Sequence, residues 1–113
     1  MPDRIVYKIM SAAELQQMQH DGVFHGSPVD TADGYIHLSC GSQVAATLDK
    51  HFSGMEGLML VAVDLSWLGD SLRWEPARGG ELFPHIYGRL PMEAVVAVAT
   101  VERTADGAVR LPA

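Results

Sequence analysis

The chain opens with an alternating segment that is followed by a helical one. In residues 4–10, Ile5, Tyr7 and Ile9 alternate with Val6 and Lys8. This period of two is typical of a β-strand. Ser11 and Glu14 have the spacing of a capping box, which marks the start of a helix. Gly22 is the residue type that ends many helices. The pattern therefore predicts a strand over residues 4–10 and a helix over residues 11–21.

A second strand and a second helix are predicted further along the chain. Residues 23–33 are rich in glycine, proline and aspartate, which predicts a loop, and a long loop in a small domain is often functional. Residues 35–39 alternate in the manner of a strand. Residues 41–52 repeat apolar positions at intervals of four, which predicts a helix with one face toward the core.

The remaining apolar segments are short and indicate strands. Residues 58–65 are almost entirely apolar, which predicts the central buried strand. The Asp106-Gly107 pair favours a tight hairpin turn. Further strands are predicted at residues 71–75, 83–87, 94–101 and 109–111. This order of elements indicates the α+β class, with two helices packed on mostly antiparallel strands.

Composition narrows the class of protein. The chain has 113 residues, of which 48% are apolar and 19% charged, so we expect one globular domain over residues 1–113. Its net charge of -6 argues against broad binding to nucleic acids or anionic membranes. No apolar run reaches the ~20 residues that span a bilayer, and the first residues lack the apolar core of a signal peptide, so we expect a cytoplasmic protein. Cys40 is the single cysteine, which excludes an internal disulfide.

Two of the predicted strands carry matching polar faces. Side chains of an extended segment alternate between its two faces. Residues 35–39 and residues 83–87 each place a histidine and a tyrosine on one face. The residues that share such a face are Tyr35, His37 and Ser39 in the first segment and Phe83, His85 and Tyr87 in the second. The sequence therefore predicts two strands that line one cleft.

His37 and His85 are candidate catalytic residues. Their reference pKa of about 6.5 lets an imidazole exchange a proton at neutral pH, and either nitrogen can bind a ribose or a phosphate. The structural alternative is a partly buried histidine bonded to a backbone carbonyl. A metal site is a further alternative, but no pair of candidate ligands has the spacing of a known metal motif, so we assign no metal ligand.

Glu75 is the candidate catalytic acid. It lies between Trp74 and Pro76, and an apolar ring beside a carboxylate can raise the carboxylate's pKa and suit it to acid or base catalysis. The structural alternative is a surface salt bridge with Arg73 or Arg78. Glu81 is the rival acid, in a segment whose glycines suggest exposure.

Three residues of the first half have open roles. Lys8 is either a cation of the cleft or a solvated strand residue. Ser39 can contact a ligand, and it also fits the N-cap of the helix that follows. Cys40 lies where a thiolate is favoured, but no neighbouring residue makes it a convincing nucleophile.

Taken together, these segments resemble the small bacterial family of domain-of-unknown-function proteins numbered 952. The matching residues are 7–9, 26–30, 33–39, 43, 73–75 and 83–88. The resemblance implies a fold similar to that of the ADP-ribosyltransferases, a split α+β structure with two sheets around a dinucleotide cleft. By that analogy His37 binds a ribose or phosphate, Tyr87 or Tyr35 stacks on a ring, and Glu75 orients a ribose hydroxyl.

This resemblance also implies the ligand. NAD or ADP-ribose is the candidate substrate, and no cofactor is certain. The residues expected to contact it, besides the catalytic set of His37, Glu75 and His85, are Lys8, Ser27, Tyr35, Ser39, Gln43, Trp74, Arg78 and Tyr87. Three hypotheses remain open: a nucleotide-dependent transferase, a non-catalytic module that binds a nucleotide or other small ligand, and a metal-assisted hydrolase. The sequence leaves the oligomeric state undetermined.

Overall fold

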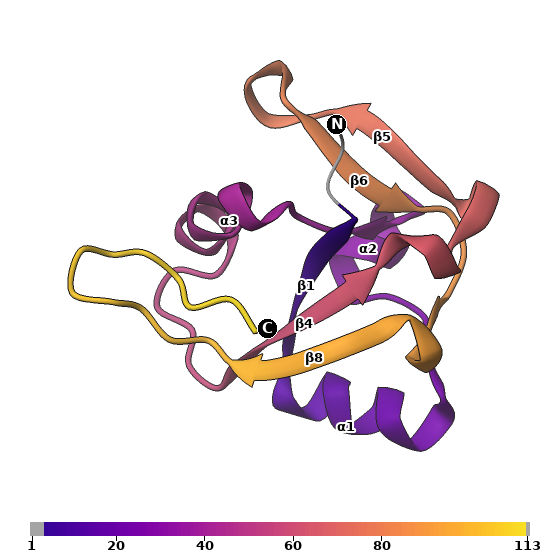
Figure 1. Ribbon diagram of the computed structural model, residues 1–113, viewed down its shortest axis with the longest axis horizontal. Helices are drawn as coiled ribbons and strands as arrows, with labels where there is room; N and C mark the ends of the chain where they lie inside the picture. Colours follow the sequence, from indigo (N-terminus) through magenta and orange to yellow (C-terminus); the bar gives the residue numbers. More distant parts are fainter. Residues whose placement is uncertain (1–3, 113) are drawn as a thin grey trace.

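The computed structural model describes residues 4–112, which form an α+β fold (Figure 1). Every strand pairing among these residues is antiparallel. The strands are β1 Ile5–Ser11, β2 Val23–Phe24, β3 Ile36–His37, β4 Leu58–Asp64, β5 Leu72–Pro76, β6 Leu82–Ile86, β7 Leu90–Pro91 and β8 Val95–Thr100. The α-helices are α1 Ala12–Asp21, α2 Pro28–Asp33 and α3 Val44–His51, and the short 3₁₀ turns include η1 Gly41–Gln43, η4 Arg78–Gly80 and η5 Met92–Ala94.

Helix α1 is formed by the local signals that predicted it. Glu14 N–H donates to Ser11 Oγ at 3.0 Å, and Ser11 N–H donates to Glu14 Oε1 at 2.8 Å, so the capping box is confirmed. Gly22 ends the helix with φ of 80°, a left-handed conformation that favours glycine. Leu15 and Met18 are its buried residues, which anchor the helix on the core.

The prediction of a loop over residues 23–33 is wrong. Val23 and Phe24 form β2, which pairs with β7, and the residues after Ser27 form α2, a third α-helix where two were expected. The signals for α2 are present in the sequence: a serine cap, Pro28 at the first turn, an aspartate three residues after the serine, and Gly34 with φ of 88° at the end. The glycines and proline of this segment bound short elements instead of forming one open loop.

The strand predicted at residues 35–39 is shorter than expected. Only Ile36 and His37 pair with β6, and Ser39 instead bridges Tyr7 in β1. The expectation that Ser39 caps the next helix is also wrong, because Cys40 is the cap of η1 and Ser39 Oγ lies 3.2 Å from Thr47 Oγ1. The helix itself begins as a 3₁₀ turn and continues as α3.

The strands of the described residues form two three-stranded sheets and one small ribbon. The sheet orders are β1-β4-β8 and β3-β6-β5, and the ribbon is β2-β7. The two larger sheets meet where Tyr7 N–H donates to the Ser39 carbonyl and Ser39 N–H donates to the Tyr7 carbonyl, both at 2.8 Å. The α+β class and the antiparallel pairing expected from the sequence are thus confirmed.

Helices cover both faces of the β1-β4-β8 sheet. Strand β4 is central and buried, as predicted, and its alternating side chains contribute to two apolar clusters. Leu15 and Met18 of α1 pack in one cluster, and Val44 and Leu48 of α3 pack in the other. Figure 1 shows α1 and α3 well separated on either side of this sheet.

The β3-β6-β5 sheet is amphipathic. Ile36, Ile86 and Trp74 point to the core, and the alternate positions of the same strands carry the polar side chains of the site. The predicted turn at Asp106-Gly107 is confirmed, since Gly107 has φ of 90° and a single bridge joins residues 103 and 109 across it. Among the described residues, no helix is long and apolar enough to cross a membrane.

Candidate functional site

A cleft of about 520 Å³ opens where the two larger sheets separate. Strand β1 forms one side, α2 and the end of α3 form two more, and β3 and β6 close the last. The described residues that line it are Tyr7, Lys8, Ile9, Val29, Asp33, His37, Leu38, Ser39, Thr47, Lys50, His51, Phe52, Ala77, Phe83 and His85. Its volume lies within the range that small-molecule sites usually have.

A buried carboxylate, Asp30, organises the β1 side of the cleft. Its side chain is 1% exposed and pairs with the buried Lys8 ammonium at 2.9 Å. The backbone N–H of Ser27 donates to it at 2.8 Å, and the backbone N–H of His37 at 3.1 Å. Burial alone would raise the pKa of Asp30, but the hydrogen bond from the His37 ring and the charge of Lys8 outweigh it and hold that pKa far below its usual value.

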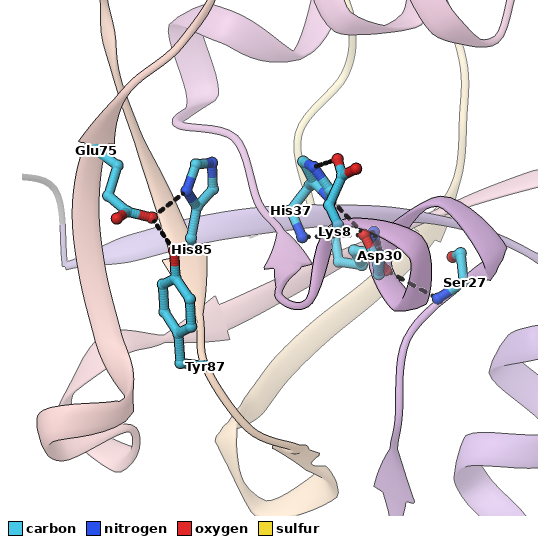
Figure 2. A network of polar contacts seen from close by, with 8 residues as sticks. Lys8, Ser27, Asp30, His37, Glu75, His85 and Tyr87 are labelled. Atoms are coloured by element: carbon cyan, nitrogen blue, oxygen red, sulfur yellow. Dashed lines mark hydrogen bonds and ion pairs between the residues drawn. The ribbon is translucent and has the colours of Figure 1, made fainter.

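His37 lies between two carboxylates (Figure 2). Its Nδ1 is 2.6 Å from Asp30 Oδ1, and its Nε2 is 2.9 Å from Asp33 Oδ2. A carboxylate only accepts hydrogen bonds, so both can form at once only when the ring is an imidazolium that donates from each nitrogen. The two partners differ in exposure, because the Asp33 side chain is 45% exposed and that of Asp30 is 1% exposed.

Beside His37, on strand β6, His85 is hydrogen-bonded to Glu75. Glu75 Oε1 lies 2.8 Å from His85 Nδ1 and accepts from the Tyr87 hydroxyl at 2.7 Å. The hydrogen bond with His85, followed by that from Tyr87, lowers the pKa of Glu75, and the bond to Glu75 raises the pKa of Tyr87. Because the carboxylate accepts, Nδ1 carries the hydrogen, and Nε2 of a neutral ring is left as an acceptor. Figure 2 shows this second nitrogen pointing away from Glu75.

Tyr35 connects the two histidines. Its ring centroid lies 4.7 Å from that of His37, 4.2 Å from that of His85 and 5.2 Å from that of Tyr87. Burial, together with the negative charges of Asp33 and Glu75, raises the pKa of Tyr35, so its phenol stays protonated. Tyr35 itself borders a smaller hollow of about 130 Å³ outside the main cleft.

The structure brings most of the expected catalytic residues together. His37 and His85 are direct partners across β3 and β6, and both line the cleft together with Lys8 and Ser39. Glu75 is absent from the described lining and reaches the cleft only through His85. The rival acid, Glu81, is exposed and lies 3.3 Å from the amide of Gln43.

Other expected ligand contacts are engaged within the fold. Gln43 accepts the Cys40 N–H and donates to the Leu82 carbonyl, so its buried amide ties η1 to β6. Ser27 precedes α2, and Trp74 packs against the core. Neither these residues nor Tyr35 and Tyr87 line the main cleft within the described part of the chain. The side chain of Arg78 lies outside what the structure describes.

Sequence reasoning missed Asp30 and Asp33 as site residues. Both lie in the segment that is predicted as a loop, although the Ser27-Pro28-Val29-Asp30 spacing is a helix-start signal of the same kind as that at Ser11. A helix from residue 28 would have placed residues 30 and 33 on adjacent turns. No group of three or more His, Cys, Asp or Glu side chains among the described residues is arranged to hold a metal ion.

The depressed pKa of Asp30 predicts a loss of stability in acid. Its folded pKa is below the unfolded value of about 3.9, so its contribution is complete above about pH 5 and falls as the pH drops toward the folded pKa. Urea unfolding measured between about pH 7 and about pH 3 should show this decline. The Asp64→Asn variant removes another carboxylate whose pKa is lowered, in this case to about 2. It should retain much of the dependence of the unfolding free energy on pH. Asp30→Asn should lose most of this dependence of stability on pH, and an equally large loss in Asp64→Asn would contradict the assignment to Asp30.

Comparisons with known proteins agree with the family expected from the sequence. Residues 9–98 match the family model described as "Protein of unknown function (DUF952)". The crystal structure of protein CC0527 from Caulobacter crescentus is 44% identical, with a TM-score of 0.85 over 94% of this chain and 93% of that one. Its solution NMR structure is 45% identical, with a TM-score of 0.79 over 95% and 91%. No curated protein matches the chain. The chain therefore belongs to the DUF952 family.

Proposed function

We propose that this protein is a cytoplasmic transferase that binds NAD or ADP-ribose in the cleft. The proposal rests on a difference in charge between the chain as a whole and the residues that line the cleft. The chain has 14 acidic and 8 basic residues, yet among the described lining residues Asp33 is the only carboxylate. The side chains there that are or can become cationic are Lys8, His37, Lys50, His51 and His85, of which Lys8, His37 and His85 each have a carboxylate partner within the protein. Such a lining suits a ligand with phosphate groups.

Both halves of a dinucleotide have complementary groups in the cleft. The ring walls come from Tyr7, Phe52 and Phe83, which replace Tyr35 and Tyr87 as the stacking residues of this proposal. The phosphates lie toward Lys50 and His37. The analogy with ADP-ribosyltransferases that the family resemblance implies supports NAD over other nucleotides.

The free edge of β1 offers a further contact. The backbone groups of Tyr7 face Ser39 and not β4, so those of Ile9, two residues on, face the same edge. Ile9 lines the cleft at this edge. Its N–H and C=O there are a donor and an acceptor, which match the carboxamide of a nicotinamide ring.

The proposed reaction uses His85 as the base. The bond between C1′ of the ribose and the nicotinamide nitrogen breaks, and nicotinamide leaves with the bonding electrons as a neutral molecule. The oxygen of water or of an acceptor hydroxyl bonds to C1′, and its proton passes to Nε2 of His85. Glu75 is a positioning residue here, because it holds the hydrogen on Nδ1 and stabilises the imidazolium that forms.

Binding of ADP-ribose tests the proposal directly. Reversing the charge of an exposed cleft cation with Lys50→Glu should weaken ADP-ribose binding about tenfold, measured by isothermal titration calorimetry. Arg110→Glu makes the same change at an exposed position that is not part of the described lining, and it should leave the affinity within about twofold. Equal effects of both variants, or no heat with ADP-ribose and NAD, would refute nucleotide binding in this cleft.

A non-catalytic binding module is the second candidate. Lys8 and both nitrogens of His37 are already paired with the protein's own carboxylates, so these groups can hold the shape of a cleft without reacting. In that case the protein binds ADP-ribose and releases no nicotinamide from NAD.

A further inference from the structure

Asp33 has a different status from the other carboxylates of the site. It is the last residue of α2, its side chain is 45% exposed, and its one described polar contact is with His37 Nε2 at 2.9 Å. Asp30, on the same helix, is buried and pairs with Lys8, His37 and the Ser27 backbone. The Asp30 carboxylate therefore fixes the orientation of the His37 ring, and the Asp33 carboxylate is bonded to Nε2 of that ring.

We propose that Asp33 stands in for an anionic group of the ligand, and that a phosphate displaces its carboxylate from Nε2 of His37. This inference rests on the proposed function, because it assigns the phosphate of that ligand to His37. The Asp33 carboxylate occupies Nε2 at the cleft wall while no ligand is bound and turns toward solvent when a phosphate arrives.

The exchange is energetically feasible because the two contacts of His37 differ in strength. Ion pairs with an exposed partner contribute little to stability, so a ligand can replace the contact with Asp33 at small cost. The contact with Asp30 is buried and stays, and Tyr35 packs against the ring. Nε2 therefore keeps its direction during the exchange, which is the preorganisation that ligand binding requires.

The position of Asp33 also selects among ligands. A neutral hydroxyl is a poor competitor for an imidazolium that already has a carboxylate, whereas a phosphate brings at least an equal charge. Asp33 should thus lower the affinity for anions by a fixed factor, whereas a ligand that places no charged group at Nε2 of His37, such as a nucleoside, should bind equally well with or without the Asp33 charge. Removing its charge should make anion binding tighter.

The test uses Asp33→Asn and Asp33→Ala with three probes. We expect inorganic pyrophosphate and ADP-ribose to bind both variants about tenfold more tightly than the natural chain, by calorimetry at constant ionic strength. Adenosine, which has no phosphate, should show no gain. Glu93→Gln is the matched control, because it removes the same charge from an exposed residue of η5 outside the described lining, and it should leave affinities within about twofold.

The outcomes separate this inference from the proposed function. Unchanged or weaker anion binding in both Asp33 variants would overturn it, and ADP-ribose binding to the natural chain would then still support the proposed function. Tighter pyrophosphate binding with no binding of ADP-ribose would support the anion site at His37 and refute the proposal that the ligand is a nucleotide. An equal gain in Glu93→Gln, an equal gain for adenosine, or no binding of either anion to any variant would also overturn the inference.

Discussion

Replacing Asp30 with asparagine should lower the free energy of unfolding by about 3–5 kcal/mol, the usual cost of removing one partner of a buried ion pair. The amide keeps the size of the side chain but leaves the Lys8 ammonium, which is 5% exposed, without its counter-charge. It also takes the charged acceptor from the His37 ring. Equilibrium urea unfolding at neutral pH measures the change.

Two further variants separate charge from shape in this prediction. Asp33→Asn changes the same residue type on the same helix at an exposed contact, and it should cost less than about 1 kcal/mol. Adding Lys8→Met to Asp30→Asn removes the unpaired ammonium and should recover part of the loss. Equal destabilisation by Asp30→Asn and Asp33→Asn would contradict the buried pair as a main source of stability.

Replacing His85 with asparagine should lower nicotinamide release from NAD by about 10²–10⁴-fold, the usual contribution of a general base. The affinity for ADP-ribose should change much less, because the phosphates lie toward Lys50 and His37 in the proposed pose. Nicotinamide release followed over time, with calorimetry on the same samples, measures both quantities.

Glu75→Gln examines the residue behind His85. It should lower turnover and also move the acid limb of the pH–rate profile to lower pH, since the imidazolium loses the carboxylate that stabilises it. A structural defect alone would lower turnover without moving the profile. Tyr87→Phe is the matched control, because it removes the other donor to the same carboxylate oxygen and leaves His85 bonded. It should keep most of the activity.

These variants also decide between the two candidate functions. A natural chain that binds ADP-ribose but releases no nicotinamide indicates the binding module. Full turnover in His85→Asn would refute the base assigned here. An active protein in which Tyr87→Phe is as damaging as Glu75→Gln would place the important contact at Tyr87 instead of His85.

Prediction from sequence succeeded where the signal is local. The capping box of Ser11 and Glu14 and the left-handed Gly22 lie within one helix, and α1 forms as predicted. Alternation in residues 35–39 and 83–87 placed His37 and His85 on matching faces, because side chains of an extended chain alternate regardless of context. The same kind of local signal precedes α2, although the composition of that segment predicts a loop.

The amino-acid sequence by itself determined the α+β class, the family and the pairing of polar faces that brings His37 to His85. These follow from backbone periods and short motifs, which act between near neighbours in the chain. Only the tertiary structure decided that Asp30 is buried against Lys8, 22 residues away, and that Glu75 lies behind His85 instead of in the cleft. Burial and side-chain pairing of this kind depend on where the two sheets join at Tyr7 and Ser39, and no local pattern encodes that junction.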